Sequence, residues 1–287
     1  MYNSAQIANK EKAVQKQPPG NDSPQWLDAT RISDALGALR DDFHIEIFDR
    51  VTSTNTLLLD RTAAGAPSGS VIAAEWQSEG HGRAGRTWYA ERGEGLTFSL
   101  LWRFECGLAG LSGLGLAVGV AVMRALDELG AAGATLKWPN DVLTKTGKLA
   151  GILVEAQNGS PDTSAAVIGI GLNLSHAQAI ADKVNQPMAA LADLVATLPD
   201  RNRLLALLLR ALHGVLTEFA AGGFAVLRAE WERRHGSQDQ PVRLTMPDGK
   251  IITGIARGVA EDGTLLLETE RGVQRFYMGE TSLRGGK

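Results

Sequence analysis

Hydrophobic and polar positions along the chain predict alternating helices and strands as far as residue 235. Phe43, Ile45 and Ile47 alternate with polar neighbours, which is the period of a half-buried strand. Apolar side chains that recur every three or four positions predict helices instead. The predicted strands are 43–47, 71–76, 96–104, 135–138, 141–144, 148–156 and 165–174. The predicted helices are 26–39, 111–129, 187–197, 200–221 and 224–234.

The pattern changes after His235, where short apolar runs replace the helices. Asp248-Gly249, Asp262-Gly263 and Arg271-Gly272 are turn sequences between these runs. Such runs, which cover 241–244, 251–255, 265–267 and 273–277, predict a small β-barrel. We therefore expect a larger domain over 26–235 and a β domain over 236–287. Residues 1–25 are rich in Gln, Lys, Asn and Pro and are expected to form a disordered leader.

Composition is typical of a soluble protein in a reducing compartment. Apolar residues make up 44% of the chain, enough for a core, and the formal charge is 29 minus 32, or −3. This balance argues against a surface that tracks nucleic acid. The single cysteine, Cys106, excludes an internal disulfide framework. The most apolar predicted helix, 204–219, contains charged residues and is expected to be too short for a bilayer, so we expect a cytoplasmic protein without a membrane segment.

Glycine is the outlier in composition, with 33 of 287 residues, and three glycines lie in a loop beside arginines. The loop Gly80-His81-Gly82-Arg83-Ala84-Gly85 has the spacing of the dinucleotide-binding fingerprint. That fingerprint requires a helix next, whereas residues 86–95 lead into another predicted strand, so we reject it. Glycines allow a ligand to approach the backbone, and Arg83 and Arg86 add positive charge. The loop is a candidate site for a phosphate or carboxylate group, with a solvated surface loop as the alternative.

A second polar cluster lies at the ends of the later strands. Lys137-Trp138-Pro139-Asn140-Asp141 joins two strands, and Pro139 disfavours helical geometry at Trp138. Lys148 follows a turn, from which its ammonium group can reach a phosphate. Gly151 and the run 169–173 put glycines inside apolar strands, which indicates close approach of a backbone or a ligand. Each feature alone has a structural alternative: a solvated lysine, glycines that relieve packing, or core tryptophans.

Taken together and in this order, the motifs resemble those of the biotin protein ligases. The motifs are Ser53-Thr54-Asn55, the loop 80–88, Lys137-Trp138-Pro139-Asn140-Asp141, the run 147–155 and Gly169-Ile170-Gly171-Leu172-Asn173. The similarity extends from about residue 46 to the end of the chain. It implies an α+β fold, with a catalytic domain related to class II aminoacyl-tRNA synthetases and lipoate ligases. This domain has a mixed β-sheet and is followed by a small SH3-like β-barrel.

The resemblance implies an ATP-dependent biotin–protein ligase, a C–N bond-forming enzyme that uses Mg²⁺. Biotin and ATP would give biotinyl-5′-AMP, from which biotin passes to a lysine of the biotin carrier domain of a biotin-dependent carboxylase. Arg83, Lys148 and Mg²⁺ would offset the repulsion between the carboxylate of biotin and the phosphates. A lipoate–protein ligase and a biotin-sensing transcriptional regulator are the alternatives.

The resemblance also assigns site residues by position. Arg83 and Lys148 take the catalytic roles, and Asp141 is the candidate metal ligand. The residues implied to bind biotin are Ser53, Thr54, Asn55, Gln77, His81, Gly82, Arg83, Lys148 and Gly151. The residues implied to bind the nucleotide are Arg83, Arg86, Trp88, Asn140, Asn173 and Arg284.

The chain departs from the family pattern in two places. His81 stands where the loop commonly has its first arginine, which changes the charge available for loop closure and its response to pH. Only 52 residues precede Ser53, too few after a disordered leader for the winged helix-turn-helix of the bifunctional members. We therefore expect no DNA binding and no repressor function. A homodimer formed by edge-to-edge pairing of the sheets is compatible with the resemblance.

Overall fold

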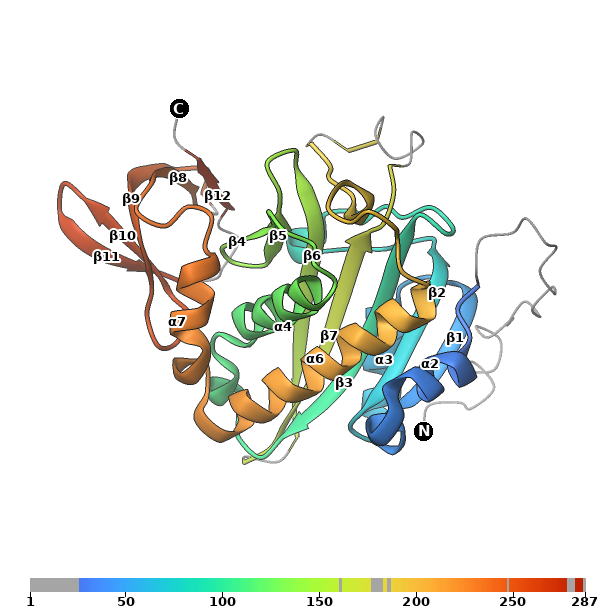
Figure 1. Ribbon diagram of the computed structural model, residues 1–287. Coiled ribbons are helices and arrows are strands. Elements are labelled where there is room, and N and C mark those ends of the chain that lie inside the picture. The colour runs from blue at the N-terminus through green and yellow to red at the C-terminus, as the bar shows by residue number, and fades with distance from the viewer. Residues whose placement is uncertain are drawn as a thin grey trace.

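A seven-stranded mixed sheet forms the larger part of the molecule (Figure 1). The computed structural model describes residues 26–159, 162–176, 183–184, 187–246 and 248–277, and the backbone alone of 282–285. The strands of the sheet are β1 (His44–Val51), β2 (Ser70–Gln77), β3 (Gly95–Phe104), β4 (Thr135–Lys137), β5 (Asp141–Leu143), β6 (Lys148–Asn158) and β7 (Ser164–Asn173). Their order is β1-β2-β3-β7-β6-β5-β4, and only β1 and β2 pair in parallel. All seven predicted strands are confirmed, whereas the leader expected over 1–25 lies outside the described residues.

Helices pack on both faces of this sheet. They are α2 (Ala29–Leu36), α3 (Thr54–Ala63), α4 (Leu114–Glu128), α6 (Arg201–Gly222) and α7 (Ala225–Arg234). Successive side chains of a strand point to opposite faces. Val71 and Leu100 accordingly belong to the main core beneath α4 and α6, whereas Ile72 and Leu101 pack against Leu58 of α3. Figure 1 shows α4 and α6 side by side across the main core face.

A buried ion pair ties α6 to β2. Asp200 caps α6, because its carboxylate accepts two backbone N–H groups of the first turn. Arg201 Nη1 then lies 2.7 Å from Glu75 Oε2, with 8% and 3% of the two side chains exposed. Glu75 also accepts the backbone N–H of Leu27 at 2.7 Å. The start of the described chain, the first turn of α6 and strand β2 therefore meet at one carboxylate.

Two helical segments are long and apolar enough to cross a membrane by length and composition. Leu108–Glu128 and Arg201–Gly222 both have the length and composition of a membrane span, so the expectation that the second is too short is wrong. In each, most of the apolar window is buried inside the protein, at 61% and 56%. Buried apolar helices of this kind are typical of a protein core, and both segments contribute residues to the main core (Figure 1).

The helix predicted over 187–197 is also wrong. Its only helical part is one 3₁₀ turn, η4 (Leu191–Asp193). Met188 instead forms a parallel bridge with Lys148, and the Ala189 N–H donates to the Lys148 carbonyl at 3.0 Å. Backbone pairing with the start of β6 therefore overrides the helical spacing of the apolar side chains.

The C-terminal segment forms a separate antiparallel sheet beside α7 (Figure 1). Its strands are β8 (Pro241–Thr245), β9 (Ile251–Val259), β10 (Leu265–Thr269), β11 (Gly272–Phe276) and β12 (Ser282–Gly285), in the order β11-β10-β9-β8-β12. Four of them were predicted, and β12 was not. The buried Trp138 joins the two parts, because its Nε1–H donates to the Gly263 carbonyl at 3.1 Å. Gly263 has a φ of +79°, and a Cβ atom there would lie 2.8 Å from Gly113 Cα, so this close contact requires glycine.

Candidate active site

The first turn of α3 gathers buried polar side chains at the ends of β1 and β2. Ser53 caps the helix, and its Oγ accepts the Thr56 N–H at 3.4 Å. The backbone N–H and the Oγ1–H of Thr54 both donate to Gln77 Oε1, at 2.7 and 3.1 Å. Of the positions that the resemblance assigns to biotin, Thr54 and Gln77 are therefore hydrogen-bonded to each other, and Ser53 caps the helix next to them.

This cluster continues across the sheet to β6. Ser99 Oγ of β3 lies 2.8 Å from Thr54 Oγ1 and 2.5 Å from Asn55 Oδ1. The amide nitrogen of Asn55 donates to Glu155 Oε2 at 2.9 Å. The same oxygen of Glu155 lies 3.8 Å from Nε2 of His81, in the glycine-rich loop. A chain of side chains therefore connects the start of α3 to the loop.

The glycine-rich loop is a closed hairpin between β2 and β3. The Trp88 N–H donates to the Gly80 carbonyl at 2.8 Å, and the Gly82 N–H donates to the Arg86 carbonyl at 2.7 Å. Its tip is one 3₁₀ turn, η2 (Arg83–Gly85), and the chain then reaches β3 without forming an α-helix. The rejection of the dinucleotide-binding fold is thus confirmed.

Arg83 reaches from this loop to the junction between β4 and β5. Its Nη1–H donates to Asn140 Oδ1 at 3.3 Å, and the amide of Asn140 is held in turn by the Ile152 carbonyl at 2.7 Å. Burial lowers the pKa of the Arg83 guanidinium below its usual value. Arg86 adds to this lowering of the pKa, whereas Asp141 opposes it. Arg83 and Asn140, both assigned to the nucleotide, are therefore in direct contact.

Two lysines surround one carboxylate beside this contact. Lys148 Nζ lies 2.6 Å from Asp141 Oδ1, and Lys137 Nζ lies 3.8 Å from Asp141 Oδ2. With Arg83 nearby, the excess of positive charge suits the phosphates of a nucleotide. Among the described residues no cluster of three or more His, Cys, Asp or Glu side chains could hold a metal ion. Asp141, the candidate metal ligand, is engaged by both lysines in this structure.

Trp88 lies on a floor made of glycines. A Cβ atom at Gly171 would lie 2.2 Å from the indole, and one at Gly151 would lie 3.1 Å from both Trp88 and Lys148 Nζ. The Lys148 ammonium is 5.6 Å from the centre of the indole ring. The indole Nε1–H is buried and has no hydrogen-bond acceptor among the described residues. Glycines in β6 and β7 thus let a flat group lie directly on the sheet.

Three further predicted site residues are Asn173 at the end of β7, Arg86 in the glycine-rich loop and Arg284 in the C-terminal sheet. The Asn173 amide donates to the carbonyl groups of Lys148 and Ala189, at 3.0 and 3.2 Å, and so connects the start of β6 to the segment at Ala189. Arg86 is exposed. Arg284 belongs to β12, of which only the backbone is described.

Three participants were not among the predicted site residues. Ser99, Glu155 and Lys137 complete the contacts of Asn55 and Asp141. Ser99 had one signal, because it is a polar residue in an otherwise apolar strand that nevertheless ends up fully buried. Glu155 and Lys137 lay inside the quoted motifs, but their positions alone do not show which way their side chains turn.

Comparison with known proteins agrees with this geometry. Residues 47–173 match the model of the biotin/lipoate A/B protein ligase family, and residues 239–284 match the biotin protein ligase C-terminal domain. The bifunctional ligase/repressor BirA of Salmonella typhimurium is 38% identical over 263 residues, which cover 92% of this chain and 80% of that protein. The chain belongs to the biotin protein ligase family. A second member, the biotin–[acetyl-CoA-carboxylase] ligase of Mycobacterium tuberculosis, is 35% identical over 84% of this chain and 90% of its own length.

Solved structures of the family share the fold. The biotin protein ligase of Aquifex aeolicus, determined in complex with biotin and ATP, superposes with a TM-score of 0.71 at 29% identity. The match covers 85% of this chain and 99% of that one. The predicted α+β architecture of a biotin protein ligase, with a mixed catalytic sheet and a C-terminal β domain, is thereby confirmed.

Proposed function

We propose that this protein activates biotin with ATP and transfers the biotinyl group to a lysine of a biotin carrier domain. The observation that carries the proposal is the convergence of Arg83, Lys148 and the Trp88 floor on one side of the polar cluster at the start of α3. The cluster supplies donors and acceptors for the ureido group of biotin, and the cations suit the phosphates of ATP. Membership of the biotin protein ligase family supports the same activity.

Activation is a displacement at the α-phosphorus of ATP. An oxygen of the biotin carboxylate forms the new bond to phosphorus, the bond to the β-phosphate oxygen breaks, and pyrophosphate leaves. Arg83 and Lys148 would stabilise the charge that develops on the phosphate oxygens. A Mg²⁺ ion bound to the substrate phosphates, with Asp141 as its candidate protein ligand, would neutralise part of their charge.

Transfer uses the mixed anhydride formed in the first step. The uncharged amine of the acceptor lysine attacks the acyl carbon, an amide forms, and AMP leaves while the amine loses a proton. The adenylate must be protected from water until then, and the loop that carries Arg83 and Trp88 is the segment that covers this side of the sheet.

The partner that we propose is the carrier domain of a biotin-dependent carboxylase, in the cytoplasm. Relatives named biotin–[acetyl-CoA-carboxylase] ligase support a carboxylase as the source of the acceptor. Other relatives are named bifunctional ligase/repressor, so the absence of DNA binding stays a prediction. A homodimer also stays a prediction.

A transfer assay with competing substrates tests the proposal. The protein, ATP and Mg²⁺ are incubated with a purified biotin carrier domain and with biotin and lipoate together, and the modified lysine is analysed by mass spectrometry. We expect the mass of biotin on a single lysine of the carrier. Lipoyl transfer in preference to biotin would contradict the proposal and favour the lipoate ligases of the same broad family.

A further inference from the structure

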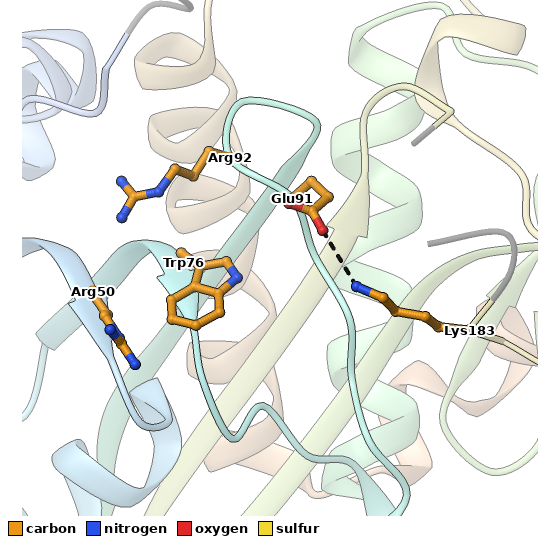
Figure 2. Close-up of a pocket in the computed structure, with 5 residues that line it drawn as sticks. All are labelled: Arg50, Trp76, Glu91, Arg92 and Lys183. Atoms are coloured by element: carbon orange, nitrogen blue, oxygen red, sulfur yellow. Dashed lines mark ion pairs between the residues drawn. The ribbon is translucent and has the colours of Figure 1, made fainter. Parts of the chain in front are cut away.

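A basic pocket opens at the carboxyl ends of β1 and β2, beside the candidate active site. Its lining residues are Arg50, Trp76, Glu91, Arg92 and Lys183, and its volume is about 390 Å³ (Figure 2). Arg50 lies opposite Trp76 in the parallel ladder, and Val51 lies opposite Gln77. The pocket therefore begins one residue before Gln77, which holds the first turn of α3. None of the lining residues belongs to the sites assigned to biotin or to the nucleotide.

The cations of the pocket differ in how they are engaged. Arg92 forms two contacts with the Asp49 carboxylate. The hydrogen bond from Arg92 lowers the pKa of Asp49 below its usual value. Lys183 Nζ lies 3.8 Å from Glu91 Oε1, the ion pair drawn in Figure 2. Arg50 is exposed and has no carboxylate within ion-pair distance in the described part of the chain.

Arg50 is nevertheless held in place. Its guanidinium carbon lies 4.6 Å from the centre of the Trp76 ring, which is a cation–π contact between the two labelled side chains of Figure 2. A guanidinium held by a cation–π contact does not use its N–H groups on a carboxylate, so they can bind both oxygens of an incoming carboxylate. The contact with Trp76 also reduces the entropy that Arg50 would lose on binding.

The charge of the pocket selects the class of anion. Three cations, Arg50, Arg92 and Lys183, less the carboxylates of Glu91 and Asp49, give a net charge of +1. One carboxylate balances this charge, whereas a phosphate dianion or a nucleic-acid strand brings more negative charge than the pocket offsets. A half-buried tryptophan beside an exposed arginine is also a typical composition of the energetic centres of protein interfaces.

We propose that this pocket binds an acidic side chain of the acceptor domain while its lysine reaches the adenylate. The proposal rests on the proposed function, because it names the chemistry by which that partner is recognised. Binding at Arg50 would lower the KM for the carrier without taking part in activation, since the pocket contains no residue of the adenylate site.

Charge reversal at Arg50 tests the proposal. We compare Arg50→Glu and Arg50→Ala with the parent and with Arg40→Glu as a matched control. Arg40 is an exposed arginine at the opposite end of β1, with only a 3.9 Å contact to an exposed carboxylate. Two activities are measured: biotin-dependent exchange of pyrophosphate into ATP without acceptor, and transfer of biotin with a purified biotin carrier domain as the varied substrate.

We expect Arg50→Glu to raise the KM for the carrier about tenfold, which corresponds to ~1.4 kcal/mol, and Arg50→Ala to raise it less. Pyrophosphate exchange should keep its parental rate, and Arg40→Glu should match the parent in both assays. Replacing acidic residues near the acceptor lysine by lysine, one at a time, should restore the KM of Arg50→Glu at one position. An unchanged KM in Arg50→Glu, or an equal loss in exchange, would overturn the proposal while the proposed function stands. Absence of exchange and transfer in the parent would overturn both.

Discussion

At the scale of single residues, small side chains matter as much as charged ones. Arg83 and Lys148 carry the charge of the candidate site, but they can approach a ligand on the sheet only because glycines form its floor. Gly171 is the clearest case, since Trp88 lies where a Cβ atom would be. The position of Trp88 in turn fixes the loop, because its backbone N–H closes the hairpin on Gly80.

We therefore expect Gly171→Ala to displace the Trp88 indole and with it the loop that carries Arg83. A displacement of about 1 Å at a reacting centre can lower the rate about 10²-fold, and we expect a loss of this order in biotin-dependent pyrophosphate exchange. Gly214→Ala is the control, because a Cβ atom at Gly214 of α6 meets nothing within 4 Å. Exchange at the parental rate in Gly171→Ala would show that Trp88 does not position the loop.

How far the sequence predicts the site depends on which contacts are local. The loop arginine and Lys148 are identifiable because the motifs that contain them are compact and ordered along the chain. Ser99 and Glu155 were missed because they meet Asn55 across 44 and 100 residues of sequence, which only the folded sheet brings together. Asn173 shows the converse, since its amide is bound to backbone carbonyl groups, a role that its place in a motif does not show.

At the scale of elements, the strands were predictable because β1 alternates apolar and polar side chains, whereas β2, β3 and β7 are short, mostly apolar runs that are buried on both faces. The helix prediction for 187–197 failed because the backbone of this segment pairs with the start of β6, so tertiary contacts override its helical spacing. β12 was missed because its pairing with β8 lies nearly forty residues away along the chain and its own four residues carry little pattern. The local sequence pattern therefore predicts an element best where the element has a clear pattern of its own and no distant segment overrides it.

The contact between α6 and β2 depends on one buried ion pair. We expect Glu75→Ala to lower the free energy of unfolding by about 3–5 kcal/mol, because it leaves the buried Arg201 without its carboxylate. Arg31→Ala is the control, since it removes a surface pair with Asp200 in which Arg31 is 54% exposed and should cost less than about 1 kcal/mol. Urea denaturation measures both values, and equal losses would show that burial does not set the value of the pair.

At the scale of the whole molecule, the catalytic sheet and the C-terminal sheet share a small set of contacts. Trp138 bonds to Gly263, the Val259 N–H donates to Glu232 at 3.2 Å, and His235 bridges to Leu136 at the end of α7. The His235 ring packs against the Trp231 ring at a tilt, with ring centres 4.6 Å apart, and burial lowers the pKa of His235 to about 4. The junction is thus built around an imidazole that is neutral at physiological pH.

This junction should weaken in acid. Because the pKa of His235 falls from about 6.5 in the unfolded chain to about 4 in the folded protein, the unfolded state binds the proton first. The contribution of the neutral His235 to the free energy of unfolding is complete above pH 6.5 and is lost as the pH falls towards 4. At pH 5 this loss is about 2 kcal/mol. We expect urea denaturation to show this loss between pH 7.5 and pH 5 in the parent and a smaller one in His235→Phe. Equal losses in both proteins would exclude His235 as the cause.

The central claim is that biotin is activated by ATP at the site formed by Arg83 and Lys148. Biotin-dependent exchange of labelled pyrophosphate into ATP measures this step alone, in the parent, in Lys148→Ala and in Lys145→Ala, whose lysine is exposed in the neighbouring turn. We predict exchange in the parent only when biotin is present, a loss of about 10²–10³-fold in Lys148→Ala, and the parental rate in Lys145→Ala. Exchange that needs no biotin, or that persists undiminished in Lys148→Ala, would contradict the claim.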